Sequence, residues 1–300
     1  MKIEFNNKEL DLTTPHVMGI LNTTPDSFSD GGQYSSVDHA VQKALKMIES
    51  GATIIDIGGE STRPGAPAVS LEEELSRVIP VIKALRRISN VWISIDTSKA
   101  DVMDQAILAG ADIVNDVRAL TSKGALDIVA KHQVPVCIMH MQGQPSTMQT
   151  NPSYDDLVQD VASFLQERVD AATSAGIKKD NIILDPGFGF GKTLEHNYQL
   201  LSVIHQFHQF ELPLLIGVSR KSMIFKLLDK KPDETALGSA LCAAFAVGQG
   251  AQIIRVHDVE ETVDAIKITQ FYQKNSLVKG QINDKTKTLF WNRWHSWQSR

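Results

Sequence analysis

The sequence predicts a single (β/α)8 TIM barrel, an α/β fold, with a short N-terminal β-hairpin and a C-terminal extension. An apolar run that ends in a polar or charged side chain occurs eight times, and a helical pattern follows each run. The chain has 300 residues, of which 42% are hydrophobic, and such barrels commonly need about 250 residues. An open doubly wound sheet is the alternative, but it normally stops at about six strands.

The first half of the chain supplies the hairpin and five strands. Residues 3–12 alternate as a hairpin with Asn6 and Asn7 at the turn, and we expect this hairpin to cover the barrel floor. The first strand runs to Leu21, and its apolar run stops at Asn22. Helical spacing between caps or glycines predicts the helices that separate the strands. We expect helices at 36–50, at 71–87 and up to Gly110, and strands at 53–58, 91–96, 111–116 and 134–140.

The second half completes the repeat. We expect strands at 181–186, 213–219 and 251–258, and helices at 153–175, 194–208, 232–249 and 258–274. Residues 1–275 then form the barrel domain and residues 276–300 a tail. The tail carries Trp291, Trp294 and Trp297 at a spacing of three, which predicts a terminal segment folded back on the outer helices, with a partner-binding surface as the alternative.

Composition restricts the compartment and the partners. The chain has 30 basic and 35 acidic residues and no basic tract, so no nucleic-acid surface is expected. No apolar run approaches the roughly 20 residues that cross a bilayer, and the first ten residues lack the apolar core of a signal peptide. Cys137 and Cys242 lie in apolar segments, as reduced buried thiols do. We expect a cytoplasmic protein that binds small molecules and no membrane.

The residues that end the strands form a candidate active site. In such a barrel the carboxyl ends of the strands meet on one face, where enzymes of this fold place their active sites. Hydrogen-bond acceptors lie on one arc of this face, and cations lie at the last two strands. Barrels commonly bind phosphate at those last two strands, and backbone N–H groups at 220–222 could donate to a phosphate here. The pattern predicts a ligand with a donor-rich ring and phosphates. The ring comprises Asn22, Asp56, Asp96, Asn115, His140, Asp185, Lys221, Arg255 and His257.

Two parts of this pattern allow another interpretation. Asp56 lies in the middle of a strand, so it could equally pair with a neighbouring cation for structural reasons. The segment GFGFGKT resembles a phosphate-binding loop, but Pro186 stands where that motif requires glycine. We interpret the segment instead as a turn that lets Phe190 reach over the site.

Six segments together resemble the dihydropteroate synthase family from about residue 15 to residue 275. They are MGILNTTPDSFSDGG, DIGGESTRPGA, ISIDTSKA, ILDPGFGFGKT, GVSRKS and IRVHD. The resemblance implies a transferase of folate biosynthesis that condenses 6-hydroxymethyl-7,8-dihydropterin pyrophosphate with p-aminobenzoate, giving 7,8-dihydropteroate and pyrophosphate. It also implies Mg2+, a homodimer, a dissociative displacement, and inhibition by sulfonamides as p-aminobenzoate analogues.

The resemblance assigns roles to matching positions. Asp96, Asn115, Asp185 and Lys221 would bind the edge of the pterin, with Arg255 on its face. Arg255 and His257 would approach the phosphates, with Thr62 and Arg63 from the second loop, and Asn22 would bind Mg2+. Asp96, Lys221, Arg255 and Asp30 would be the catalytic residues. Phe28, Pro64, Phe190 and Ser222 would frame the p-aminobenzoate slot, and Met139 would be a further substrate-binding residue.

Other classes of protein share part of this pattern. A methyltetrahydrofolate methyltransferase has a similar acidic pterin floor, but it would not need the TPDSFSDGG and STRPG loops. Lys221 could instead form a Schiff base in an aldolase, and a pterin-binding protein without activity is a further alternative. For the homodimer, the small-residue helix at 236–251 is the candidate contact, although the same composition also suits ordinary burial.

Overall fold

The structure is a computed structural model that describes residues 1–23, 33–61, 66–143 and 148–276. Eight parallel strands form one sheet in the order β8-β7-β6-β5-β4-β3-β10-β9, and a bridge between Leu184 and Leu214 joins its two edges. This closure confirms the (β/α)8 barrel. The strands are β3 (His16–Asn22), β4 (Ile54–Gly58), β5 (Trp92–Asp96), β6 (Ile113–Asp116), β7 (Val136–Met139), β8 (Ile182–Asp185), β9 (Leu215–Ile216) and β10 (Ile253–Val256).

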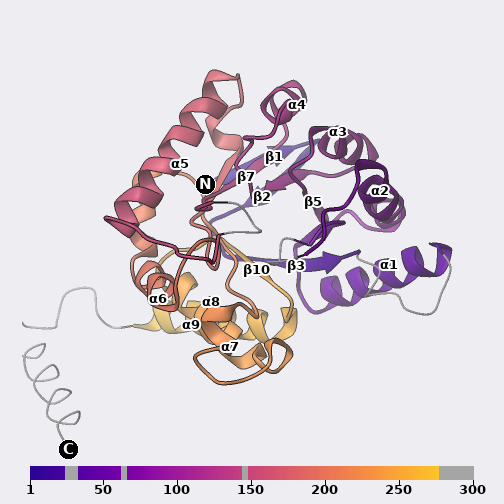
Figure 1. Cartoon of the computed structure of the whole chain (residues 1–300). Helices are drawn as coiled ribbons and strands as arrows, with labels where there is room; N and C mark the ends of the chain where they lie inside the picture. The colour runs from indigo at the N-terminus through magenta and orange to yellow at the C-terminus, as the bar shows by residue number, and fades with distance from the viewer. Residues whose placement is uncertain (24–32, 62–65, 144–147, 277–300) are drawn as a thin grey trace, which may run out of the picture.

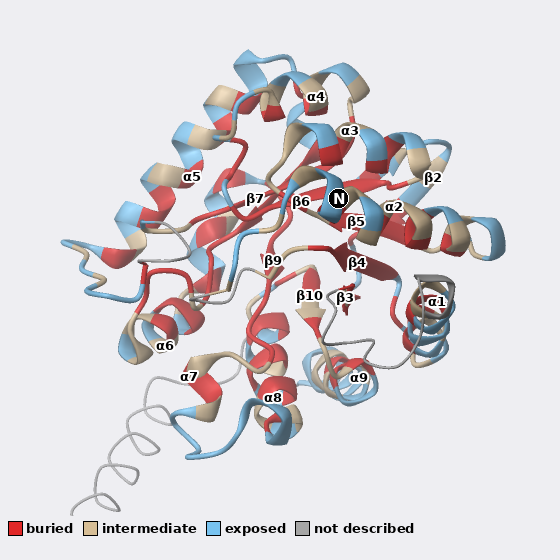
Figure 2. Ribbon diagram, turned by 45° about the vertical axis from the view of Figure 1, so that its right-hand side comes forward, coloured by how far each residue is buried: buried red, intermediate tan, exposed pale blue. Residues whose placement is uncertain are grey.

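The helices surround the strands (Figure 1) and turn their apolar sides inward, so that buried residues face the sheet (Figure 2). Local sequence explains where they begin and end. In α2, Ser70 accepts a hydrogen bond from the Glu73 N–H, and Arg86 and Arg87 lie in the last turn. The helices are α1 (Gln33–Glu49), α2 (Leu71–Ile88), α3 (Ala100–Ala109), α4 (Ala125–His132), α5 (Leu157–Ser174), α6 (Leu194–Ser202), α7 (Ser222–Phe225), α8 (Ala236–Gly248) and α9 (Val259–Asn275).

Several element boundaries differ from the sequence expectation: the helix expected at 153–175 begins at Leu157, and the helix expected at 36–50 begins at Gln33. The seventh barrel strand, β9, ends at Ile216 rather than Ser219. A turn follows it, closed by a hydrogen bond from the Lys221 N–H to the Val218 carbonyl, in which Arg220 adopts a left-handed φ of 54°. The helix expected at 194–208 ends at Ser202 and continues as the 3-10 helix η3 (Ile204–Phe210). The helix expected from 232 begins with a 3-10 turn, η4 (Pro232–Glu234), before α8.

The N-terminal hairpin forms the floor of the barrel. Strands β1 (Lys2–Phe5) and β2 (Lys8–Asp11) pair antiparallel across Asn6 and Asn7, whose φ values of 50° and 60° suit a tight hairpin turn. Hairpin side chains and the first inward-facing residues of the barrel strands form one buried cluster. Its members are Ile3, Leu10, Leu12, Met18, Ile54, Trp92, Ile113, Cys137, Ile183, Leu215 and Ile253. The predicted covered floor is confirmed.

Candidate active site

A polar layer lies directly above this apolar floor. Successive side chains of a strand point to opposite faces, so a residue two positions beyond a floor residue also points into the barrel. Ile54, Ile183 and Ile253 of the floor are therefore followed inside the barrel by a charged residue on the same strand. This layer comprises Asp56, Ser94, Asn115, Asp185 and Arg255, and Asp96 lies at the end of β5 above Ser94.

Arg255 connects the acidic side chains of this layer. Its Nε donates to Asp56 Oδ2 at 2.6 Å, and its Nη2 donates to Asp96 Oδ2 at 2.7 Å. Asn115 Nδ2 donates to the same Asp56 oxygen at 3.3 Å. Burial disfavours the charged guanidinium, but Asp56 and Asp96 outweigh burial and raise the pKa of Arg255. Burial raises the pKa of Asp96 to about 7, although Arg255 opposes the shift. Arg255 therefore stays charged, and Asp56 is ion-paired.

Asp185 and Lys221 lie on the neighbouring side of the barrel. Asp185 Oδ1 accepts a hydrogen bond of 2.7 Å from the Gly187 N–H. Burial raises the pKa of Asp185, and the nearby Lys221 opposes that shift. Burial lowers the pKa of Lys221 to about 8, against the attraction of Asp185. Lys221 Nζ donates to the Phe188 carbonyl and lies 4.6 Å from the centroid of the Phe190 ring.

The GFGFGKT segment forms a turn between β8 and α6. Gly187 has a φ of +75°, and a Cβ there would lie 1.7 Å from the His140 carbonyl oxygen, so only glycine fits. Phe190 packs with Val117, Met139 and Met148, so Met139 and Phe190 lie together beside Lys221.

Sequence reasoning missed Lys192, the last residue but one of this segment. The side chain is 2% exposed, and its Nζ bonds the segment's own carbonyls rather than pointing into the barrel mouth. Burial lowers the pKa of Lys192 to about 7. The signal in the sequence is a lysine at the end of a glycine-rich turn.

The remaining described residues of the prediction lie at or just beyond the ends of other strands, and among them the His140 ring packs against Tyr154 and Phe164. Ser219 Oγ is 3.1 Å from His257 Nδ1, so the last two strands are joined at their upper ends. Ser222 begins α7, a helix of only four residues. Arg220, beside the expected phosphate-binding backbone, forms an ion pair with Asp258 instead. Asn22 ends β3, and its side chain makes no hydrogen bond to another described residue. Phe28, Asp30, Thr62, Arg63 and Pro64 lie outside the described residues, as does the tail from residue 277.

Comparison with known proteins places this site in a family. The family described as pterin binding enzyme matches residues 18–257. The chain is 57% identical over 270 residues to dihydropteroate synthase of Haemophilus influenzae, covering 90% of this chain and 98% of that protein. It resembles the crystal structure of Yersinia pestis dihydropteroate synthase with a sulfonamide drug, with a TM-score of 0.88, 54% identity, and coverage of 91% of this chain and 100% of that one. The Xanthomonas albilineans enzyme in complex with 7,8-dihydropteroate gives a TM-score of 0.83 at 44% identity, covering 91% and 99% of the two chains.

A barrel with this polar layer, matched over the whole sheet by that family, is a pterin-binding enzyme. The six motifs had indicated a more particular assignment, which the relatives confirm. The chain belongs to the dihydropteroate synthase family. It is a transferase of folate biosynthesis. The methyltransferase, the Schiff-base aldolase and the pterin-binding protein without activity are therefore set aside.

Proposed function

We propose that the polar layer binds 6-hydroxymethyl-7,8-dihydropterin pyrophosphate and directs its reaction with p-aminobenzoate to 7,8-dihydropteroate and pyrophosphate. The observation that carries this proposal is the charged array at the carboxyl ends of the strands. Arg255 is held between Asp56 and Asp96, within the layer that also contains Asn115 and Asp185. A planar ligand rich in N–H donors would satisfy these acceptors.

The pterin binds by its hydrogen-bonding edge. Asp185 accepts two hydrogen bonds from the amino-pyrimidine part of the ring, a charge-assisted fork that suits a carboxylate. Asp96 and Asn115 meet the remaining ring nitrogens, and Lys221 donates to the ring oxygen. Arg255 stacks on the pterin face and, with His257, approaches the phosphates, which Thr62 and Arg63 also reach.

p-Aminobenzoate binds beside the pterin. Its slot is framed by Phe28, Pro64, Met139, Phe190 and Ser222. The contact of Phe190 with Met139 and with the Lys221 ammonium supports this arrangement, because it sets an apolar wall beside a cation. A sulfonamide that mimics p-aminobenzoate occupies the same slot and inhibits the enzyme.

The residues present fit a magnesium ion at the pyrophosphate. Mg2+ prefers to keep waters and phosphate oxygens and takes few protein ligands. No group of three or more His, Cys, Asp or Glu in the described part of the chain could hold a metal, whereas the Asn22 amide oxygen is available at the rim. Asn22 would supply that one ligand, and the bound ion would neutralise charge on the leaving pyrophosphate.

The displacement is dissociative, because the described polar layer offers cations and acceptors rather than an activated nucleophile. Lys221 and Arg255 stabilise negative charge that leaves with the pyrophosphate. The electron-rich pterin stabilises the resulting cation and Asp96 balances its positive charge, and Asp30 of the first loop is the remaining catalytic residue that we propose. The bond from the reacting carbon to the pyrophosphate oxygen breaks first, and pyrophosphate leaves with the electron pair. The arylamine nitrogen then forms a bond to that carbon, and the acidic proton of the resulting ammonium passes to water or pyrophosphate, so no strong base is needed.

Release of pyrophosphate tests this proposal. The purified chain should release pyrophosphate and form 7,8-dihydropteroate in equal amounts when the pterin pyrophosphate, p-aminobenzoate and Mg2+ are all present. Omitting p-aminobenzoate or Mg2+ should reduce the rate sharply. Pyrophosphate release at the full rate without p-aminobenzoate would indicate a hydrolase instead.

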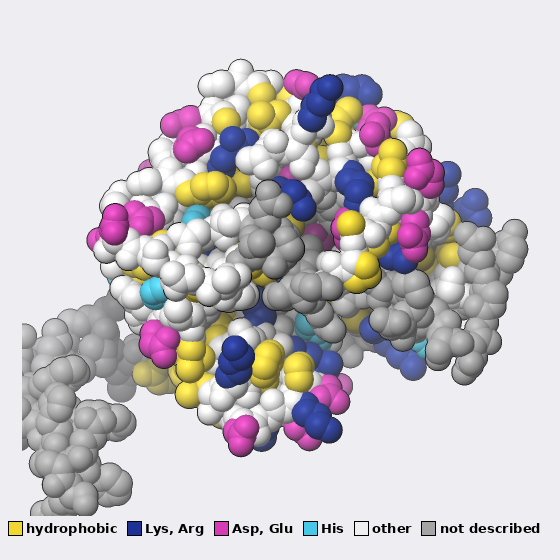
Figure 3. Space-filling view, in the orientation of Figure 1, with side chains coloured by type: hydrophobic (Ala, Val, Ile, Leu, Met, Phe, Trp, Pro, Cys, Tyr) yellow, Lys and Arg dark blue, Asp and Glu magenta, His cyan; other side chains and the backbone are white. Residues whose placement is uncertain are grey.

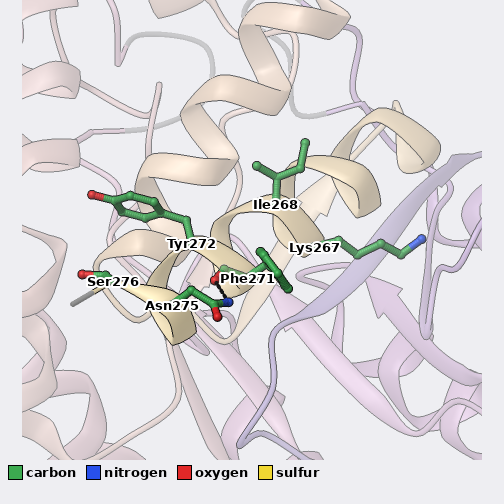
Figure 4. A pocket seen from close by; sticks show the side chains of 6 residues that line it. All are labelled: Lys267, Ile268, Phe271, Tyr272, Asn275 and Ser276. Carbon is green, nitrogen blue, oxygen red and sulfur yellow. Dashed lines mark hydrogen bonds between the residues drawn. The ribbon is translucent and has the colours of Figure 1, made fainter.

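We also propose that the enzyme is a homodimer that pairs through the α8–α9 face, defined as Leu237, Leu241, Phe245, Ile268, Phe271 and Tyr272. Each of these side chains is more than half exposed, and together they make a large apolar surface. On α9, the side chains of Ile268, Phe271 and Tyr272 line a groove of about 600 Å³ (Figure 4). A second copy related by a two-fold axis would cover this self-complementary face.

Charge substitution tests the dimer. Phe245→Lys should shift the protein from dimer to monomer in analytical ultracentrifugation, because a lysine would be buried against an apolar surface. Leu108→Lys on α3 is the matched control, since Leu108 is 67% exposed but lies on another helix. Equal behaviour of both variants would exclude this face.

A cytoplasmic location is part of the proposal. Both cysteines are free and buried, as expected in a reducing compartment. The described helices include none that could cross a membrane. Acidic and basic side chains are interspersed over the face drawn in Figure 3, which suits small-molecule rather than nucleic-acid binding.

A further inference from the structure

Lys192 makes a set of contacts that the reaction, as described, does not use. Its Nζ lies 2.8 Å from the Gly187 carbonyl oxygen, 2.9 Å from His140 Nδ1 and 3.2 Å from the Phe190 carbonyl oxygen. A lysine ammonium has three N–H donors and no acceptor. Three acceptors for three donors leave no donor for a phosphate.

His140 can accept a hydrogen bond from the Lys192 ammonium. Burial, and then the Lys192 charge, lower the pKa of His140 to about 2, so the imidazole is neutral. A neutral imidazole can accept at Nδ1 while its proton resides on Nε2. Lys192 therefore ties the turn after β8 to the end of β7.

Other hydrogen bonds also hold the turn between β8 and α6 in place. Asn197 Oδ1 of α6 accepts from the Gly189 N–H at 2.6 Å, and Lys221 donates to the Phe188 carbonyl. Gly187 packs so closely on the His140 backbone that the turn has no room to shift toward β7. The main chain on both sides of Phe190 is thus fixed, and Lys192 supplies two of the bonds that fix it.

We propose that Lys192 is a positioning residue for p-aminobenzoate: by binding the carbonyls of Gly187 and Phe190 and the imidazole of His140, it holds the Phe190 ring as a wall of the slot. The inference rests on the proposed role of Phe190 in that slot. Lys192 acts through the backbone and does not touch the substrate. On the pterin side, Asp96, Asn115 and Asp185 form no hydrogen bond with Lys192, and only Asp185 is linked to the turn, through the Gly187 N–H and the attraction of the Lys192 charge. Lys192 should therefore affect p-aminobenzoate more than the pterin.

Replacement of Lys192 separates the two substrates. Lys192→Met keeps an unbranched side chain that is one heavy atom shorter and removes all three donors, so the turn loses its anchor. We expect KM for p-aminobenzoate and the Kd of a sulfonamide to rise about 10- to 100-fold, the cost of displacing a contact group by about 1 Å. The Kd of the pterin and kcat at saturating p-aminobenzoate should change less than about threefold.

Two further variants keep the test decisive. Lys192→Gln retains two donors, so it should fold even if Lys192→Met does not, and should show an intermediate effect on KM for p-aminobenzoate. Lys179→Met, an exposed lysine in the 3-10 helix η2 (Lys179–Asn181), is the control and should leave both substrates unaffected. A stability loss without a change of KM in Lys192→Gln would show a purely structural lysine.

Phe190→Ala distinguishes failure of this inference from failure of the proposed function. If Phe190→Ala weakens sulfonamide binding while both Lys192 variants do not, Lys192 does not position the ring and the inference is wrong. If Phe190→Ala itself leaves sulfonamide and p-aminobenzoate binding unchanged, the slot is misplaced and the proposed function must be revised. Equal weakening of pterin and p-aminobenzoate by Lys192→Gln would also contradict the inference.

Discussion

Ile183 and Asp185 lie two residues apart on β8 and both point into the barrel, but they have opposite surroundings. Ile183 is fully buried in the apolar floor, under the hairpin. Asp185 is almost as buried, yet its neighbours are the Gly187 N–H and the Lys221 ammonium. One strand therefore contributes a side chain whose burial stabilises the fold and another whose burial opposes ionisation.

The same contrast holds around the whole barrel. Floor residues need no polar partner, and burying such a side chain stabilises the fold by about 1.5–3 kcal/mol. In the polar layer, Asp56 Oδ1 and Ser94 Oγ are buried without a hydrogen-bond partner among the described residues, and burial raises the pKa values of Asp96 and Asp185. Buried polar groups without hydrogen-bond partners lower the stability of the fold, as is usual at sites where such groups bind a ligand.

The largest expected effect is on the floor. Ile183→Ala should lower the free energy of unfolding by about 2–5 kcal/mol, because it removes a fully buried side chain and leaves a cavity. Denaturant unfolding measures this change. The Kd of the pterin should stay at the wild-type value once the variant is folded. If pterin binding weakened in proportion to the lost stability, the apolar floor and the polar layer would not be energetically separate.

Lys221→Ala should have a smaller effect, confined to the upper end. Loss of hydrogen bonds to charged or polar ligand atoms costs about 1.5–3 kcal/mol, so pterin and pyrophosphate binding should both weaken. The melting temperature should change by only a few degrees, as Lys221 forms no ion-pair contact in the described residues. Calorimetric titration and a thermal melt measure both quantities, and collapse of the fold would indicate a structural lysine.

The pH dependence should be smaller still. Asp96 accepts from the pterin only when ionised, and burial raises its pKa to about 7 in the free enzyme. Affinity for a pterin without phosphates should therefore rise about tenfold between pH 6 and pH 8. The free energy of unfolding should instead fall as pH rises over this range. The contribution of Asp96 is fully present below its ordinary pKa of 3.8 and is lost as pH rises through about 7. Asp96→Asn should abolish this part of the affinity profile, and its persistence would assign the titration to another group.

The sequence predicted most of this division because alternation along a strand is a local property. Ile183 and Asp185, or Ile253 and Arg255, show in the sequence which residues share a face. The predicted ring brought together Asp96, Asn115 and Arg255, which are joined through shared contacts.

What could not be predicted depends on contacts between distant parts of the chain. Asp56 has two interpretations in the sequence, because only the pairing of β10 with β3 brings Arg255, 199 residues further on, to Asp56. Lys192 was missed for the same reason, since its anchor His140 lies 52 residues earlier. The turn after β9 has Arg220 in the left-handed region, and arginine is a residue type that gives no signal of this conformation in the sequence.

The most direct test compares Asp185→Asn with Ile183→Ala on the same strand. In Asp185→Asn an amide donor faces ligand donors, so pterin affinity should fall by about 1–3 kcal/mol, roughly 5- to 150-fold, with little loss of stability. Ile183→Ala should do the reverse. Calorimetric titration of the pterin into both folded variants, each with a measured free energy of unfolding, decides the matter. Wild-type pterin affinity in Asp185→Asn would contradict the assignment of the polar layer as the pterin site.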